Sequence, residues 1–210
     1  MKKITSILLA LVLVLSLAAC APKDLAAEIK GTWTVDFEVS PADMGLDTMG
    51  LETGMVIPLI YTFAEDGTYS MTVNAERFTE RFAEFMTGTK TFIQEMMVQE
   101  FEAQGIDPEE GIAAFEQEAG MTFDAYMDSV LEALDMETLT DTIVESMVSQ
   151  GTYAVEEAGK LSICAEGEEN NAEVCSFEVK DNTLTILDTN ESKSESQFPA
   201  TPLTLTEAAA

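Results

Sequence analysis

The 210-residue sequence predicts an α+β protein, in which an antiparallel meander β-barrel of about eight strands is interrupted by a helical insert of four to five short helices. Two observations predict this class. Apolar and polar residues alternate with a period of two in residues 31–74 and again from Gly151 onward, which is typical of strands with one solvated face. In residues 75–150 apolar residues recur instead at helical spacing. Short consecutive strands can close into a small barrel.

The first block, residues 31–74, predicts three strands in which every second residue is apolar. These positions are Trp33, Val35, Phe37 and Val39, then Ile57, Leu59, Tyr61 and Phe63, then Tyr69, Met71 and Val73. Pro58 indicates an edge or a bulge in the second strand, because proline cannot donate a ladder hydrogen bond. Glu65-Asp66-Gly67 predicts the turn that follows this strand.

The helical block, residues 75–150, contains apolar stripes such as Phe78, Phe82, Phe85 and Met86. A helix start is predicted at Asp107-Pro108-Glu109-Glu110, with aspartate at the N-cap and proline at the first helical position. Four glycines are the predicted C-terminal stops: Gly88, Gly105, Gly120 and Gly151.

The last block predicts five strands with short turns between them, including one at Asp181-Asn182. The predicted strands are residues 152–156, 160–165, 173–180, 182–188 and 197–206. Residues 31–74 and 151–206 together would form the barrel, and residues 75–150 the insert.

The N-terminus has the pattern of an export signal. Two lysines precede an apolar run from Ile7 to Ala19, which is shorter than the roughly 20 apolar residues that span a bilayer. Leu17-Ala18-Ala19-Cys20 resembles the lipobox of bacterial lipoproteins, and this resemblance implies that Cys20 is lipidated before residues 1–19 are removed. We therefore expect residues 20–30 to be a lipidated tether on the extracytoplasmic face of the cell membrane.

The chain is strongly acidic, with 39 Asp and Glu, 10 Lys and Arg, and no His, for a net charge of −29. Without the signal, 8 basic and 39 acidic residues give −31. We expect no nucleic-acid binding, because phosphates need Lys and Arg. We also expect the body to stand off an anionic membrane surface. The absence of histidine excludes Ser-His-Asp triads, Cys-His pairs and imidazole metal ligands.

Cys164 and Cys175 flank the polar loop 166–173 of a predicted hairpin. Outside the cytoplasm such a pair can form a disulfide. The alternation of the two strands puts the two cysteines on opposite faces, so a bridge needs a bulge or a strand that ends early. We favour the disulfide, and two reduced thiols, one of them half-buried, are the alternative.

The strand motifs resemble those of the lipocalin-like domains of bacterial lipoproteins. Gly31-Thr32-Trp33 matches the G-x-W pattern that opens the first lipocalin strand, and Phe63-Ala64-Glu65-Asp66-Gly67-Thr68-Tyr69 resembles the F-x-x-D-G-T hairpin of the bacterial domains. Gly151-Thr152-Tyr153, Lys160-Leu161-Ser162-Ile163 and Asp181-Asn182-Thr183-Leu184-Thr185-Ile186 look like their later strands. The resemblance implies a lipocalin-like barrel with Trp33 at its closed end, beneath a basic residue that Lys160, Lys180 or Lys193 could supply.

A barrel of this size has room for one small ligand or for its own side chains. The predicted ligand-pocket residues are Trp33, Phe37, Tyr61, Phe63, Tyr69 and Met71. A filled interior is the alternative. The helical block holds seven of the twelve methionines, which would either pack as core or cap the barrel mouth and gate an apolar ligand.

No catalytic motif of the G-x-S-x-G, P-loop or G-x-G-x-x-G type is present, so we assign no catalytic residues. The acidic loop 166–173 offers oxygen ligands without the EF-hand spacing, so we expect no metal and no cofactor. We expect a non-catalytic, membrane-anchored lipoprotein that binds a small apolar or amphipathic ligand in a barrel or helix pocket. A structural or protein-interaction module of the cell envelope, with a filled barrel, is the alternative.

Overall fold

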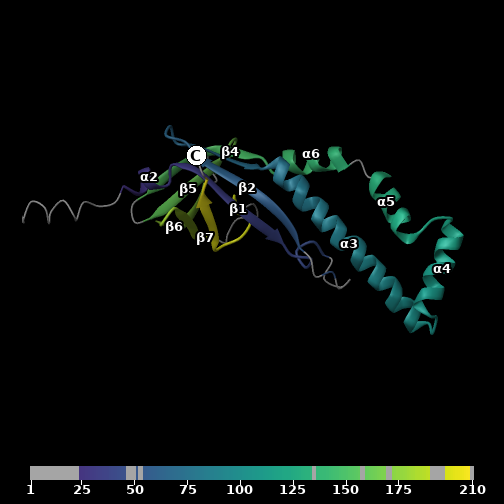
Figure 1. Ribbon diagram of the computed structural model, residues 1–210. Helices are drawn as coiled ribbons and strands as arrows, with labels where there is room; N and C mark the ends of the chain where they lie inside the picture. Colours follow the sequence, from purple (N-terminus) through teal and green to yellow (C-terminus); the bar gives the residue numbers. More distant parts are fainter. Residues whose placement is uncertain are drawn as a thin grey trace, which may run out of the picture.

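The computed structural model describes residues 24–45, 51, 54–133, 136–156, 159–168, 172–189 and 197–208. The predicted export signal, Cys20 and Lys193 lie outside these residues. Eight antiparallel strands form a closed barrel in meander order (Figure 1), which confirms the predicted fold class. The strands are β1 (Gly31–Val39), β2 (Met55–Phe63), β3 (Thr68–Val73), β4 (Ser149–Glu156), β5 (Lys160–Ala165), β6 (Glu173–Lys180), β7 (Thr183–Thr189) and β8 (Leu203–Glu207).

The β1–β2 hairpin is longer than the strands that close the barrel. β1 and β2 pair along their whole length, whereas β8 joins β1 only at Trp33 and Thr34. β3 pairs with β2 no further than Leu59, and the Asn74 amide then donates to the Pro58 carbonyl at 2.9 Å. Pro58 therefore lies where β2 has β1 as its only strand partner, which is the edge position that proline tolerates.

Two tight turns form at the residues that were predicted to form them. The Asp66 carboxylate accepts hydrogen bonds from the hydroxyl and the amide of Thr68, which lower the pKa of Asp66, and Gly67 has a φ of +84°. Asp181 and Asn182 have φ values of +50° and +62°. Both are residue types that tolerate this left-handed region, so the β6–β7 turn can be two residues long.

Part of the predicted tether packs on the barrel instead of extending from it. The Asp24 side chain accepts from the Ala27 amide at 3.2 Å and caps a short helix, α2 (Leu25–Glu28). Ile29, one turn after Leu25, is fully buried in the core. This apolar spacing gives residues 25–29 a face that the barrel covers, so this part of the predicted tether belongs to the folded body.

The last strand is shorter than predicted. β8 begins at Leu203, and residues 197–202 form no strand. Pro199 and Pro202 interrupt this stretch, and a proline cannot donate to a sheet ladder.

Four helices lie between β3 and β4, as predicted for the insert. They are α3 (Ala75–Ala103), α4 (Pro108–Ala119), α5 (Phe123–Ala133) and α6 (Met136–Ser146). Asp107 caps α4 by accepting from the Glu109 amide, and Gly120 ends it with a φ of +71°, both as predicted.

Two of the predicted helix stops are wrong. Gly88 lies inside α3, a single helix of 29 residues, because apolar residues on both sides of it continue one stripe and a glycine costs a helix only about 1 kcal/mol. Gly151 lies within β4, since the chain has already left α6 and paired with β3.

We call residues 75–146 the arm, because they lead away from the barrel and back (Figure 1). The first turns of α3 pack on β2, where Phe78 and Phe82 are buried with Ile57 and Leu59. The rest of α3 runs away from the barrel, α4 lies at the far end, and α5 and α6 return to β4. α2 lies at the opposite end of the barrel from the arm.

Candidate functional site

The predicted ligand pocket is occupied by its own side chains. Trp33, Tyr61, Phe63 and Tyr69 are each at most 3% exposed and belong to one core cluster, against which Phe37 and Met71 pack half-buried. Phe63 also meets the Tyr153 ring edge-on, with 5.1 Å between ring centroids. A ligand-sized cavity would leave accessible surface on these side chains, so the described interior is filled.

Gln197 and Phe198, which precede β8, close this core on one side. Gln197 accepts at its side-chain oxygen from the hydroxyls of Tyr69, at 2.7 Å, and Ser149, at 2.6 Å. Its main-chain carbonyl accepts from the Tyr61 hydroxyl at 3.2 Å. Phe198 stacks on the Tyr61 ring, with centroids 5.6 Å apart. Burial raises the pKa of both tyrosines, which stay neutral donors.

Glu173 anchors the same segment. Its carboxylate is buried and accepts from the Gln197 amide at 2.6 Å. Tyr61 and Tyr69, two of the predicted ligand-pocket residues, therefore hold a piece of the chain itself. Sequence reasoning missed this arrangement, because residues 197–202 were predicted as strand; Pro199 and Pro202 were the available signal.

Trp33 lies at the end of the barrel that α2 covers. Its indole Nε1 donates to the Ile29 carbonyl at 2.7 Å. Trp33 and Lys180 line the same hollow of about 270 Å³, beside the β6–β7 turn. Of the two candidate basic residues that the structure describes, Lys180 lies beside the tryptophan, while Lys160 lies in β5 and pairs with Ser176. Lys193 lies outside the described residues.

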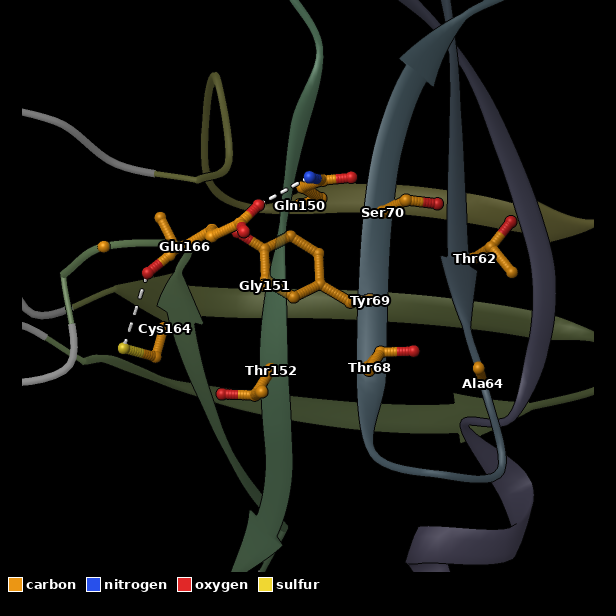
Figure 2. A pocket seen from close by; sticks show the side chains of 12 residues that line it. Thr62, Ala64, Thr68, Tyr69, Ser70, Gln150, Gly151, Thr152, Cys164 and Glu166 are labelled. Carbon is orange, nitrogen blue, oxygen red and sulfur yellow. Dashed lines mark hydrogen bonds between the residues drawn. The ribbon is translucent and has the colours of Figure 1, made fainter.

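A groove of about 520 Å³ crosses the outer face of β2, β3, β4 and β5 (Figure 2). We call it the outer groove. Most of its side chains are small or carry hydroxyls: Thr62, Ala64, Thr68, Ser70, Gly151, Thr152, Ala165 and Gly167, with Tyr69, Gln150, Cys164 and Glu166. Gly151 is required here, because a Cβ at this position would lie 2.0 Å from the Cys164 carbonyl oxygen. The groove offers hydrogen bonds but no paired nucleophile and base.

The disulfide that we favoured is absent from the structure, where Cys164 and Cys175 are free thiols. Cys175 is buried opposite Leu161, whereas Cys164 lies in the outer groove and donates to the Glu168 carbonyl at 3.2 Å. Because β5 and β6 pair without a bulge between Ile163↔Glu173 and Lys160↔Ser176, the two thiols stay on opposite faces. Burial raises the pKa of Cys175 to about 12.

The arm differs from the barrel in what it leaves exposed. Six of its large apolar side chains are about two-fifths exposed. They are Met96, Ile106, Met121, Tyr126, Val130 and Leu139. They lie on α3, α5 and α6 and in the two connections that flank α4.

A second hollow of about 520 Å³ is lined by residues of α3, α4 and their connection. These two helices meet at the end of the arm farthest from the barrel (Figure 1). We call this hollow the arm-end pocket. Its lining is Phe101, Ile106, Glu110, Gly111, Ala114, Phe115 and Glu118. None of these residues was predicted as a site. The signal available in the sequence was the helical spacing of Glu110, Ala114 and Glu118 beside Phe115, but such spacing is equally typical of an ordinary amphipathic helix.

The described part of the chain holds no group of three acidic or cysteine side chains arranged to bind a metal ion. None of its helices is both long and apolar enough to cross a membrane. Comparisons with protein-family models, curated proteins and solved structures found no match to this chain.

Proposed function

We propose that the chain is an extracytoplasmic lipoprotein, anchored in the cell membrane by lipidated Cys20, that acts without catalysis as a protein-interaction module of the cell envelope. In this proposal the barrel is a filled scaffold and the arm is the contact surface. One observation carries it: among the described residues the barrel strands leave one large apolar side chain exposed, Leu187, whereas the arm exposes six. Exposed apolar side chains gathered in one part of a molecule are a feature of interaction sites.

The position of α2 supports the division of roles. Cys20 lies five residues before Leu25, and α2 covers the barrel end opposite the arm (Figure 1). Acyl chains on Cys20 would hold that end nearest the membrane. The 29 residues of α3 span about 44 Å and would carry α4 away from the bilayer. The arm would therefore meet partners outside the membrane.

The packing of the barrel argues against a small-ligand carrier. A ligand in the interior would have to displace Phe198 from Tyr61 and break the hydrogen bonds that Gln197 accepts. Leaving those buried hydroxyls unpaired would cost about 1–3 kcal/mol each. For this reason the interaction module, which the sequence left as the alternative, is the better supported function.

Site-specific photo-crosslinking in cells tests the proposal. A photoreactive phenylalanine analogue replaces Tyr126, which is exposed on α5, or Thr204, which is exposed on β8. We expect a discrete protein adduct from position 126 and none from position 204. The absence of an adduct at 126, or the same adducts from both positions, would contradict the proposal.

The anchor is tested separately by Cys20→Ser. We expect this variant to keep its signal, to incorporate no labelled palmitate and to fold normally, because Cys20 lies before the folded body. Normal lipid labelling of Cys20→Ser would contradict the lipobox assignment while leaving the role of the arm untouched.

A further inference from the structure

We propose that the arm-end pocket binds a cationic amphipathic segment of a partner protein, seating its apolar side chains in the pocket and its Lys or Arg residues on Glu110 and Glu118. This inference rests on the proposed function, since it names the chemistry of the partner that the arm would hold. It is carried by the floor of the pocket, its rim and the charge of the surrounding chain.

The floor is apolar and closely packed. Gly111 lets α3 and α4 approach, because a Cβ there would lie 2.6 Å from the Phe101 ring. Phe115 meets Tyr126 edge-on at 5.4 Å and Phe123 at 6.0 Å between ring centroids, so α5 supports it from behind. Ile106 remains 40% exposed at the edge of the pocket. A leucine or phenylalanine of a partner would bury this surface.

The rim is acidic and regularly spaced. Glu110, Ala114 and Glu118 follow one another at intervals of four residues, so they share one face of α4. The eight-residue interval between the two acids corresponds to about 12 Å along the helix. Both glutamates are exposed, and their side chains border the pocket. A partner helix with two basic residues about two turns apart, and an apolar residue between them, would match this spacing.

The negative charge around the pocket favours a positively charged partner. The arm has three basic residues, and all are engaged within the fold: Arg77 with Asp36, Arg81 with Glu84, and Lys90 with Asp124 and Asp128. Residues 91–150 contain 15 acidic residues and no basic one. A second copy of the arm, or an anionic lipid surface, would bring like charge to the apolar surface. A basic segment brings the opposite charge.

Fluorescence anisotropy with designed peptides tests the inference on the purified full-length protein in non-ionic detergent. The probe is a labelled 18-residue helical peptide of Leu and Lys. A Leu/Glu peptide with the same apolar pattern and a Ser/Lys peptide with the same charge serve as controls. We expect the Leu/Lys peptide to bind at least about tenfold more tightly than either control, because the pocket requires both apolar contact and positive charge.

Two double variants with equal changes in charge distinguish peptide binding at the pocket from general attraction to an acidic protein. Glu110→Gln/Glu118→Gln removes the rim, whereas Glu156→Gln/Glu178→Gln removes two exposed acids from the barrel. We expect the first pair to weaken binding about five- to tenfold and the second less than twofold. Ile106→Gln, at an exposed turn, should weaken binding about threefold. Circular dichroism verifies that each variant is folded.

Equal weakening by both pairs would overturn the inference, as would equal binding of the Leu/Glu peptide or no binding at all. A dimer of the full chain that Ile106→Gln dissociates in sedimentation would show the pocket to be a self-contact and would also overturn it. If any of these contradicting results were obtained while position 126 still crosslinked to a partner in cells, the cationic amphipathic partner would be ruled out. The proposed role of the arm as a contact surface would be unaffected.

Discussion

The barrel and the arm come from sequences of similar hydrophobicity but bury their apolar residues to different degrees. In the barrel the opposite wall encloses inward side chains such as Trp33, Tyr61 and Leu205, which are 0–2% exposed. In the arm, α4 and α5 pack on neighbouring helices, and no described strand covers their outer faces. Met121 and Tyr126 therefore remain 43% and 40% exposed. The closed barrel buries apolar side chains in its own interior, whereas the arm carries exposed apolar surface of the kind that a partner covers.

The largest expected effect is the loss of Trp33 from the barrel. Trp33→Ala should lower the free energy of unfolding by about 3–5 kcal/mol, because it leaves a cavity and removes the hydrogen bond to Ile29. The matched change in the arm, Tyr126→Ala, should cost about 1 kcal/mol or less, since its ring is already partly in water. Urea denaturation followed by far-UV circular dichroism measures both. Equal losses of unfolding free energy in the two variants would contradict the difference in burial between the barrel and the arm.

Glycine substitutions should show the same contrast at a smaller scale. Gly151→Ala should cost about 1–3 kcal/mol, because the added Cβ would meet the backbone oxygen of Cys164, which cannot move without disturbing β5. Gly120→Ala meets open space and should cost only the strain of a left-handed residue, about 1 kcal/mol. Thermal melts compare the two variants, and a Gly120→Ala protein less stable than Gly151→Ala would contradict the packing.

Alkaline pH should weaken the barrel. Burial raises the pKa of Cys175 from 9.0 to about 12 and raises that of Tyr61 above 10.0. The unfolded chain therefore loses these protons before the folded barrel does. Stability should be fully retained below about pH 9 and then fall by about 1.4 kcal/mol per pH unit for each such group. Urea midpoints from pH 7 to 11 measure this slope.

The matched control is Cys175→Ala, which removes the first group to titrate. This variant should hold its stability level to about pH 10, where the tyrosines of the unfolded chain begin to ionise. An unchanged slope between pH 9 and 10 would show that Cys175 is not enclosed by the barrel.

The smallest expected effect concerns the ion pairs that join α3 to α5. Lys90 lies 3.1 Å from Asp124 and 2.8 Å from Asp128, and these carboxylates raise its pKa. Because the pairs are exposed, Lys90→Gln should speed hydrogen exchange in α5 by at most about fivefold and leave β1–β8 unchanged. Faster exchange in the strands would mean that the arm and the barrel unfold together.

The strands could be predicted because alternation is a local property of the sequence. The alternation of Trp33, Val35 and Phe37 with polar residues was enough to predict a strand with one solvated face. Asp181 and Asn182 predicted a turn by themselves, because both residue types tolerate the left-handed backbone conformation. The start of α4 at Asp107 was equally local. These features do not depend on which part of the chain lies opposite.

Tertiary features could not be predicted in the same way. Gly88 resembles a helix stop, yet α3 continues through it, because apolar residues on both sides of the glycine continue one stripe. The role of Tyr61 and Tyr69 depends on Gln197, more than 120 residues away, which no periodicity reveals. The arm-end pocket depends on the angle at which α3 and α4 meet, and Gly111 alone does not specify that angle.

Hydrogen exchange measured by mass spectrometry on the protein in its own membranes, and again on the purified protein in detergent, tests the central claim most directly. We expect α4 and α5 to exchange more slowly in the native membrane, where the proposed partner would cover them, and β1–β8 to exchange at the same rate in both preparations. Slower exchange of the barrel strands alone, with α4 and α5 unchanged, would contradict it and would point to a ligand inside the barrel.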